Sequence, residues 1–435
     1  GWSYADVLPY FKRYENRIGE HDTTYRGTDG EQTVTDLEWR HPLCDAFIKA
    51  AVGIGIPENK DYNGGIQEGV SYVQRTTKGR LRVSAAKAFL NPAKKRRNLS
   101  IRTNAHVMRI ELEGKRATAV RYAVGGRHGV EHVVEARREI ILSAGTINSP
   151  HILQLSGIGP KELLDDLGIE VKHHLPGVGE NLRDHYAPRF TARAKNISTI
   201  NELSRGPRLW AEIGKYLLGK QSIVGLGPTL VYAFWHSNEA IRNHDLQLTF
   251  APASYKEGVQ SQLDNEPGFT VASWQQRPES LGWVKARSAD PFDKPRIQPN
   301  YLSAEEDKRV LLAGMRLCRR IMATPELAPY LDYEQYPGEH IQRDDELLQV
   351  ARERGTTTYH LMGACRMGPD SDPTAVVDSD LRVKGIKGLR VADASIMPTM
   401  LSSNLNAGAL MIGEKASDLV LGKEPLEPIM DAIQH

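Results

Sequence analysis

Hydrophobic and polar residues alternate along two stretches of the chain, and this alternation predicts two groups of β-strands. The first group lies between residues 99 and 142 and contains the runs LSIRT, HVMRIELE, RATAVRYAV and REIILSA. The second group follows Asp184 and contains the runs PRFTARAK, TLVYAFW, DLQLTFAP, GFTVASWQQ and LGWVKARS. With a period of two residues, the apolar side chains of a strand all lie on one face, so that this face of the sheet packs against the core. We therefore expect a meander that leads into one buried strand, and later an antiparallel sheet of five runs.

Helical periodicity is clearest in two later segments. The first runs from about Ala304 to Met322, and its apolar stripe is expected to fill a core. That stripe consists of Val310, Leu311, Met315, Cys318 and Met322. The second segment, NLNAGALMIGEKASDLVLG, predicts a helix that ends at Gly422, because glycine commonly follows the last helical residue. A shorter helix is predicted near PKELLDDLG.

The stretch ILSAGTINSPHILQLSGIG has the pattern of a strand, a turn and a helix. An apolar run meets small residues at Ala144 and Gly145. Asn148 or Ser149 is expected to cap the helix, with Pro150 in its first turn. This order of elements is typical of a nucleotide-binding unit, although the glycines do not spell G-x-G-x-x-G.

Two kinds of secondary-structure pattern, one α/β and one β-rich, predict the fold class of the chain. An α/β pattern around residues 99–184 returns around residues 359–422, and the β-rich stretch lies between these pieces. Two separated α/β pieces are expected to form one layered domain, with the insert as a second domain. The predicted class is therefore α/β with an α+β insert built on an antiparallel sheet.

Composition and net charge limit the binding partners and the cellular compartment that we expect for this protein. The formal net charge of +2 over 435 residues argues against a nucleic-acid partner. Cys44, Cys318 and Cys365 form no C-x-x-C pair, which favours reduced thiols and a reducing compartment. No apolar stretch is long enough to predict a transmembrane helix. We expect a cytoplasmic protein or one at the periphery of the inner membrane.

Candidate chemistry gathers near the C-terminal α/β piece. His360 lies in the glycine-rich segment YHLMGACRMG, and Asn404 lies at the mouth of the predicted C-terminal helix. An imidazole can act as a general base that takes the proton of a hydroxyl, and an amide N–H can donate a hydrogen bond to the alkoxide that develops. Taken alone, His360 also fits a structural histidine and Asn404 a plain N-cap.

Several catalytic classes lack their sequence signature. The chain contains no G-x-S-x-G elbow, no H-E-x-x-H motif and no Walker loop. The segments GIGIP and GVGENL resemble glycine fingerprints only loosely, and no metal site is predicted. The remaining candidates are therefore His360 and Asn404.

Five motifs in order resemble the glucose–methanol–choline (GMC) oxidoreductase family, within it the bacterial choline-dehydrogenase-like alcohol dehydrogenases. These motifs are GTINSPHILQLSGIG, LPGVGENLRDH, YHLMGACRMG, AVVDSDLRVKGIKGLRVADASIMP and NLNAGALMIGEKASDLV. The resemblance runs through essentially the whole chain. It implies a flavin enzyme with a discontinuous FAD-binding domain and a substrate domain on an antiparallel sheet.

The resemblance also assigns roles to residues and boundaries to domains. His360 is implied as the active-site base and Asn404 as its partner. At the FAD it places Val107, Ala144 and Gly145 along the adenosine end, Asp393 and Ala394 at the pyrophosphate, and Asn406 and Ala407 at the pyrimidine edge of the flavin. The expected parts are 1–98 linking both domains, 99–184 and 359–422 for FAD, 185–358 for substrate, and 423–435 as a tail.

One feature departs from the family pattern. Relatives begin with a G-x-G-x-x-G unit and an acidic residue for the adenosine ribose, and neither occurs in residues 1 to 435. Since the glycine loop supplies phosphate-binding amides, we expect a chain that lacks the N-terminal FAD-binding segment, is incomplete and binds FAD weakly or not at all.

The implied reaction is oxidation of a small alcohol to an aldehyde. His360 would take the hydroxyl proton while a hydride passes to flavin N5, and a quinone, an electron carrier or O₂ would reoxidise the flavin. Two alternatives stay open: a non-redox lyase that keeps FAD without using it, and a truncated, flavin-free chain without activity. Tyr232, Trp235, Trp274 and Trp283 fit sheet core or a choline cage, and a primary alcohol is the expected substrate.

Overall fold

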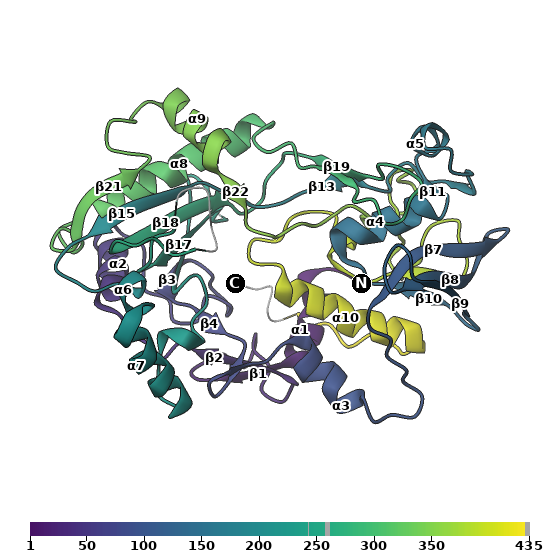
Figure 1. The fold of residues 1–435 in the computed structure, drawn as a ribbon, viewed down its shortest axis with the longest axis horizontal. Coiled ribbons are helices and arrows are strands. Elements are labelled where there is room, and N and C mark those ends of the chain that lie inside the picture. Colours follow the sequence, from purple (N-terminus) through teal and green to yellow (C-terminus); the bar gives the residue numbers. More distant parts are fainter. Residues whose placement is uncertain (242, 257–261, 431–435) are drawn as a thin grey trace.

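The computed structural model describes residues 1–241, 243–256 and 262–430. Within these residues two large hydrophobic cores lie side by side, one under a six-stranded sheet and one around a smaller α/β arrangement. Figure 1 shows the sheet in the left half of the molecule and the second arrangement in the right half. The predicted tail is described as far as residue 430, and residues 431–435 lie outside the described residues.

The six-stranded sheet is antiparallel throughout and has the order β21-β15-β18-β17-β16-β3. Its strands are β3 (Gly69–Tyr72), β15 (Arg189–Ala194), β16 (Val231–Trp235), β17 (Leu246–Ala251), β18 (Gly268–Gln275) and β21 (Leu331–Tyr336). Four of the five predicted runs are confirmed here. The edge strands β3 and β21 were not recognised as its members from the sequence.

The fifth run, β19 (Gly282–Lys285), lies elsewhere, so the prediction of one sheet from all five runs is wrong. It pairs with β13 (Glu180–Leu182) and β20 (Arg296–Gln298). The buried side chain of Gln154 explains the difference, because it donates to the carbonyl of Val284 and accepts from the amide of Ala286. These bonds hold β19 against the α/β core.

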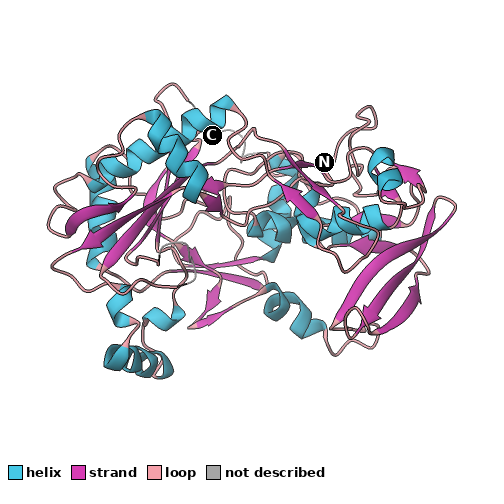
Figure 2. Ribbon diagram, turned by 45° about the horizontal axis from the view of Figure 1, so that its top comes forward, coloured by secondary structure: helices cyan, strands magenta, loops and turns pink. Residues whose placement is uncertain are grey.

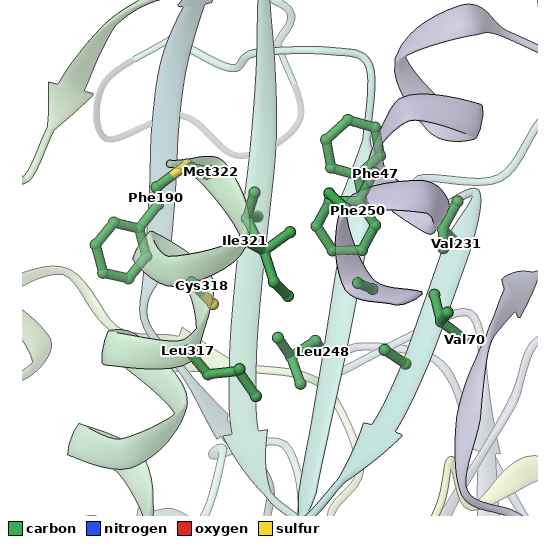
Figure 3. Close-up of a cluster of buried hydrophobic side chains, with 14 of the residues drawn as sticks. Phe47, Val70, Phe190, Val231, Leu248, Phe250, Leu317, Cys318, Ile321 and Met322 are labelled. Carbon is green, nitrogen blue, oxygen red and sulfur yellow. The ribbon is translucent and has the colours of Figure 1, made fainter. Parts of the chain in front are cut away.

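One face of the six-stranded sheet is covered by α2 (Pro42–Gly53) and α8 (Glu305–Met322). Figure 3 shows Phe47 of α2 and Phe250 of β17 facing one another, with ring centroids 4.5 Å apart. All five residues of the predicted apolar stripe are buried on α8. The helix predicted over 304–322 is confirmed, and its Met and Cys residues fill the core.

The second core lies below an antiparallel meander and a parallel strand pair. The meander consists of β7 (Ala105–Glu113), β8 (Arg116–Val124) and β9 (Val130–Glu135), as predicted. The parallel pair consists of β10 (Ile140–Leu142) and β23 (Leu389–Val391). The predicted strand LSIRT is wrong: Leu99 and Ile101 are exposed in a loop that forms no ladder with a described strand.

The helix after β10 begins earlier than predicted. This helix, α4 (Gly145–Leu155), has Pro150 in its interior, and neither Asn148 nor Ser149 caps it. Instead the Asp393 carboxylate accepts from the Gly145 amide at 2.9 Å and from the Ser149 hydroxyl at 2.5 Å. A side chain 248 residues away thus replaces a local N-cap, which a local pattern does not reveal.

The remaining elements pack around the two cores or connect them (Figure 2). The helices are α1 (Tyr4–Tyr14), α3 (Asn91–Ala93), α5 (Lys161–Asp166), α6 (Ile200–Leu203), α7 (Gly206–Leu217), α9 (Asp344–Arg354) and α10 (Asn406–Leu421), with a π-helical turn at Ala86–Leu90 and 3-10 turns at Ile223–Gly225 and Ala394–Ile396. The short strands are β1 (Glu15–Ile18), β2 (Gln32–Asp36), β4 (Gln74–Arg75), β5 (Thr77–Lys78), β6 (Leu81–Arg82), β11 (Ile158–Gly159), β12 (His173–His174), β14 (Tyr186–Ala187) and β22 (Thr356–Thr357). The predicted end of α10 is confirmed, since Gly422 adopts the left-handed conformation there.

Candidate active site

A large cavity lies over the sheet face that α2 and α8 leave uncovered. Its volume is about 1470 Å³, and it is lined by alternate residues of β15, β16, β17 and β18 together with the segment 353–360 and Asn404. Because side chains alternate along a strand, the residues between the lining ones point into the hydrophobic core. The sheet therefore has two different faces: one packs against the hydrophobic core, and the other lines the cavity and carries more polar side chains.

The structure brings the two predicted catalytic residues together in this cavity. The Asn404 Nδ2 atom lies 2.9 Å from His360 Nε2, and both residues line the cavity. Leu405, not Asn404, occupies the N-cap position of α10. The interpretation of Asn404 as a plain N-cap is thus wrong, and its amide is directed at the imidazole.

A second histidine, which the sequence did not single out, touches His360. The chain at β14 runs antiparallel to β22, and the Thr358 amide donates to the His185 carbonyl at 3.0 Å. This pairing brings His185 Nδ1 within 3.0 Å of His360 Nδ1, with the rings perpendicular. The His185 Nε2 atom lies 2.7 Å from the Gln276 carbonyl, which only accepts, so the His185 proton is on Nε2.

This arrangement also determines where His360 carries its proton. The His185 Nδ1 atom can only accept, and the Thr358 hydroxyl donates to the His185 carbonyl at 3.2 Å. The Thr358 oxygen, 2.7 Å from His360 Nδ1, is then free to accept as well. We therefore assign the proton of His360 to Nδ1, which leaves the Nε2 lone pair directed at Asn404.

Asp184 fixes the backbone of the same segment. One carboxylate oxygen accepts from the His360 amide at 2.9 Å, and the other accepts from the Tyr301 and Thr357 hydroxyls. Burial raises the pKa of Asp184, and these hydrogen bonds partly oppose the rise. The only sequence signal for Asp184 and His185 was their place at the end of the motif LPGVGENLRDH.

Burial keeps both imidazoles neutral. It lowers the pKa of His360 to about 4, and burial together with the charge of His360 lowers the pKa of His185 to about 3. At neutral pH His360 is therefore a neutral base whose Nε2 lone pair accepts from the Asn404 amide. This is the protonation state that accepts a proton from a hydroxyl.

The residues expected at the cofactor lie around the carboxyl ends of two parallel strands. Ala144 and Gly145 follow β10, Asp393 and Ala394 follow β23, and these two strands pair directly. Ligands of α/β folds bind at such an edge. A Cβ added at Gly145, where φ is +81°, would meet no atom within 4 Å, so this turn is open to a ligand.

The other expected cofactor residues lie nearby or on the rim of the same core. Asn406 and Ala407 form the exposed first turn of α10, and no side chain caps it. Free amides at a helix start attract electron-rich groups. Val107 on β7 is half-buried and packs against the same hydrophobic core as Ala144 and Ala394. The open turn and the uncapped helix start both fit FAD.

Comparisons with known proteins agree with this architecture. The C-terminal model of the GMC oxidoreductases matches residues 278–413, and the N-terminal model matches residues 1–187. The oxygen-dependent choline dehydrogenase of Vibrio vulnificus is 40% identical over 98% of this chain and 76% of its own length. The human mitochondrial choline dehydrogenase is 40% identical over 98% of this chain and 71% of its own length.

A solved structure shares the fold. The crystal structure of pyridoxine 4-oxidase from Mesorbium loti has a TM-score of 0.85 and 27% identity, over 97% of this chain and 78% of that one. The predicted GMC resemblance, the mixed α/β fold class and FAD as the cofactor are confirmed. The expectation that this chain lacks the N-terminal FAD segment and is incomplete is not supported, since the N-terminal model matches from residue 1.

No helix among the described residues has the length and the apolar character that a membrane crossing requires.

Proposed function

Because this chain belongs to the GMC oxidoreductase family, we propose that it oxidises the CH–OH group of an alcohol to an aldehyde, with His360 as the proton acceptor. Members of the family are flavin oxidoreductases that act on alcohol-type substrates. The observation that carries the proposal is the neutral His360, whose Nε2 lone pair meets the Asn404 amide in a large cavity.

The residues of this chain divide the proton chemistry among them. When bound, FAD supplies the hydride acceptor. His360 Nε2 takes the hydroxyl proton, and the Asn404 Nδ2–H group, which now donates to that nitrogen, donates to the substrate oxygen. His185 Nδ1 and the Thr358 oxygen accept from His360 Nδ1–H and keep the ring oriented when it becomes an imidazolium.

We propose the same cofactor residues as the resemblance implied: Val107, Ala144, Gly145, Asp393, Ala394, Asn406 and Ala407. The open Gly145 turn and the uncapped start of α10 support this assignment. We also propose that residues 99–184 and 359–422 form the FAD side, that 185–358 form the substrate side, and that 1–98 link them. The contribution of α1 to one core and of α2 to the other supports that link.

Anaerobic mixing of the FAD-loaded protein with a primary alcohol tests the proposal. We expect loss of the oxidised-flavin absorbance together with formation of the aldehyde. The variant His360→Ala serves as control and should bleach far more slowly. A flavin that stays oxidised while a cyanohydrin is cleaved would contradict the proposal and support the lyase alternative.

The route by which electrons leave the flavin needs a separate assay. We propose a quinone or an electron carrier as the acceptor, with O₂ as the alternative. Dye reduction much faster than O₂ consumption supports the carrier, and equal rates support an oxidase.

A further inference from the structure

We propose that the alcohol substrate carries a carboxylate group, and that Arg189 on the cavity floor binds it. This inference rests on the proposed function and names the substrate class of the same site. The evidence is a cationic side chain in the cavity that has no acidic partner. Its position relative to His360 then sets the size of the substrate.

Arg189 stands on the cavity face of β15. Its neighbour Phe190 is buried in the hydrophobic core, so alternation turns Arg189 toward the cavity that it lines. One nitrogen, Nη1, donates to the Thr356 hydroxyl at 2.9 Å. A guanidinium has five N–H donors, and this is the one hydrogen bond that the Arg189 side chain forms to a described residue, so most of its donors remain available to a ligand.

The contrast with Arg193 on the same strand shows what Arg189 lacks. Arg193 forms ion pairs with Asp264 and Glu266. Among the residues that the structure describes, no carboxylate lies within ion-pair distance of Arg189. Burial lowers the pKa of Arg189, with Tyr255 and Tyr359 acting in the opposite direction. A half-buried charge without a counter-ion costs free energy, which an anionic ligand would recover.

The other charged groups around the cavity do not neutralise this one. Asp264 is engaged by Arg193, and Glu353 is exposed on α9, where its carboxylate accepts from Gln349. Lys256 adds positive charge to the lining, and Arg354 stacks on a neighbouring tyrosine ring. Among the described lining residues, none of these groups is an anionic partner for Arg189.

These charges argue against a choline cage. Such a cage needs aromatic faces and a carboxylate around one ammonium group. Of the four aromatic residues considered from the sequence, Tyr232 and Trp274 line the cavity, whereas Trp235 and Trp283 are not among its lining residues. Arg189 would repel an ammonium group at this position.

The segment that holds both functional groups sets the spacing between them. Thr356 binds Arg189, and Thr358 binds His360, two residues further along the chain. Two residues of extended chain span about 6–7 Å. A short hydroxy acid can therefore place its hydroxyl at His360 and its carboxylate at the guanidinium. A planar fork of N–H donors matches the two carboxylate oxygens.

Three substrates of similar size test the proposal on the FAD-loaded protein. We expect kcat/KM for γ-hydroxybutyrate to exceed the values for n-butanol and choline by at least about tenfold, because a hydrogen bond to a charged group contributes roughly 1.5–3 kcal/mol. Arg189→Gln should remove this preference, mainly through KM. Arg189→Lys should keep part of the preference. Arg208→Gln on α7, exposed and outside the cavity lining, is the matched control.

A binding measurement separates the two proposals. Butyrate should bind the wild-type protein in calorimetry and butyramide should not, and the binding should weaken at least about tenfold in Arg189→Gln. Butyrate binding that depends on Arg189, with no turnover of any alcohol, would keep the carboxylate site and refute the oxidation. Equal use of n-butanol and γ-hydroxybutyrate, unaffected by Arg189→Gln, would refute the carboxylate site and keep the oxidation. The butyrate–butyramide pair needs no variant, so a misfolded Arg189→Gln does not remove the test.

Discussion

The two faces of the six-stranded sheet use the same strands for opposite purposes. On one face, Phe190 and Phe250 are buried beneath α2 and α8. On the other, their chain neighbours Arg189 and Thr249 line the cavity with His360. A step of one residue along a strand thus separates side chains that hold the fold from side chains that meet a ligand. The packed face gives the polar face a rigid support.

The polar face also holds groups that packing alone does not explain. The Gln247 Oε1 and Trp274 Nε1 atoms are buried and have no hydrogen-bond partner among the described residues. Trp274 lines the cavity, and the Nε2–H group of Gln247 donates to Asn404 Oδ1. Unpaired polar atoms cost stability and are typical of functional sites. The difference between the faces can be tested by paired substitutions.

The largest effect is expected at His360. His360→Ala should lower turnover by about 10²–10⁴-fold, because it removes the proposed proton acceptor. The melting temperature should change little, since His360 lies on the cavity side and not in the packed core. Steady-state kinetics and circular dichroism measure the two effects. Turnover close to the wild-type value would contradict the assigned role.

An effect of comparable size, on folding stability and not on turnover, is expected at Phe250. Phe250→Ala should lower the free energy of unfolding by about 3–5 kcal/mol, because the cavity it leaves under α2 cannot be filled. Thr249→Ala, one residue away on the cavity face, is the control and should cost about 1 kcal/mol or less. Urea unfolding measures both. Equal losses of unfolding free energy at Phe250 and Thr249 would contradict the assignment of different roles to the two faces.

A smaller effect is expected at Thr358. Thr358→Val removes one of the two groups that accept from His360 Nδ1, while His185 remains, and kcat/KM should fall about 2- to 12-fold, in line with the loss of one hydrogen bond. Thr358→Ser keeps the hydroxyl and should restore most of the activity. A valine variant as active as the serine variant would mean that the hydroxyl does not orient the ring.

The smallest effect is expected from pH. Burial holds the pKa of His360 at about 4, so kcat/KM should fall by less than about twofold between pH 7 and pH 5. A histidine with an ordinary pKa near 6.5 would lose about 20-fold or more over this range. The pH profile in a buffer of constant ionic strength distinguishes these cases.

The pH dependence of stability has a definite sign. His360 and His185 have a lower pKa in the folded chain than in the unfolded one, so the unfolded chain binds more protons below about pH 6.5. Their contribution is complete above that pH and is lost as the pH falls toward the folded-state values. Thermal melts between pH 7 and pH 4 should therefore show a falling melting temperature.

The sequence predicted what depends on periodic packing. The alternation of β15 to β18 and the apolar stripe of α8 were both visible, because burial of one face imposes a period. His360 and Asn404 were candidates from their residue types and positions, and the family resemblance implied their roles, but the 44 residues between them gave no local sign of contact. The structure supplies that contact.

The missed features depend on single contacts between distant segments. His185 meets His360 across 175 residues, and Asp393 caps α4 from 248 residues away. A single polar residue in a loop belongs to no periodic pattern, so the sequence does not indicate which residue it contacts. The same holds for β19, whose place is set by one buried glutamine and not by its alternating pattern.

The distant cap on α4 has a consequence for the timing of synthesis. Ribosomes add about 5–20 residues per second, so Asp393 follows Gly145 by roughly 12–50 s. During that interval β10 also lacks its partner β23. The turn after β10 therefore reaches its final form only when nearly the whole chain has left the ribosome. Under the proposed cofactor assignment, capture of the flavin at this edge would be a late step in the synthesis of the protein.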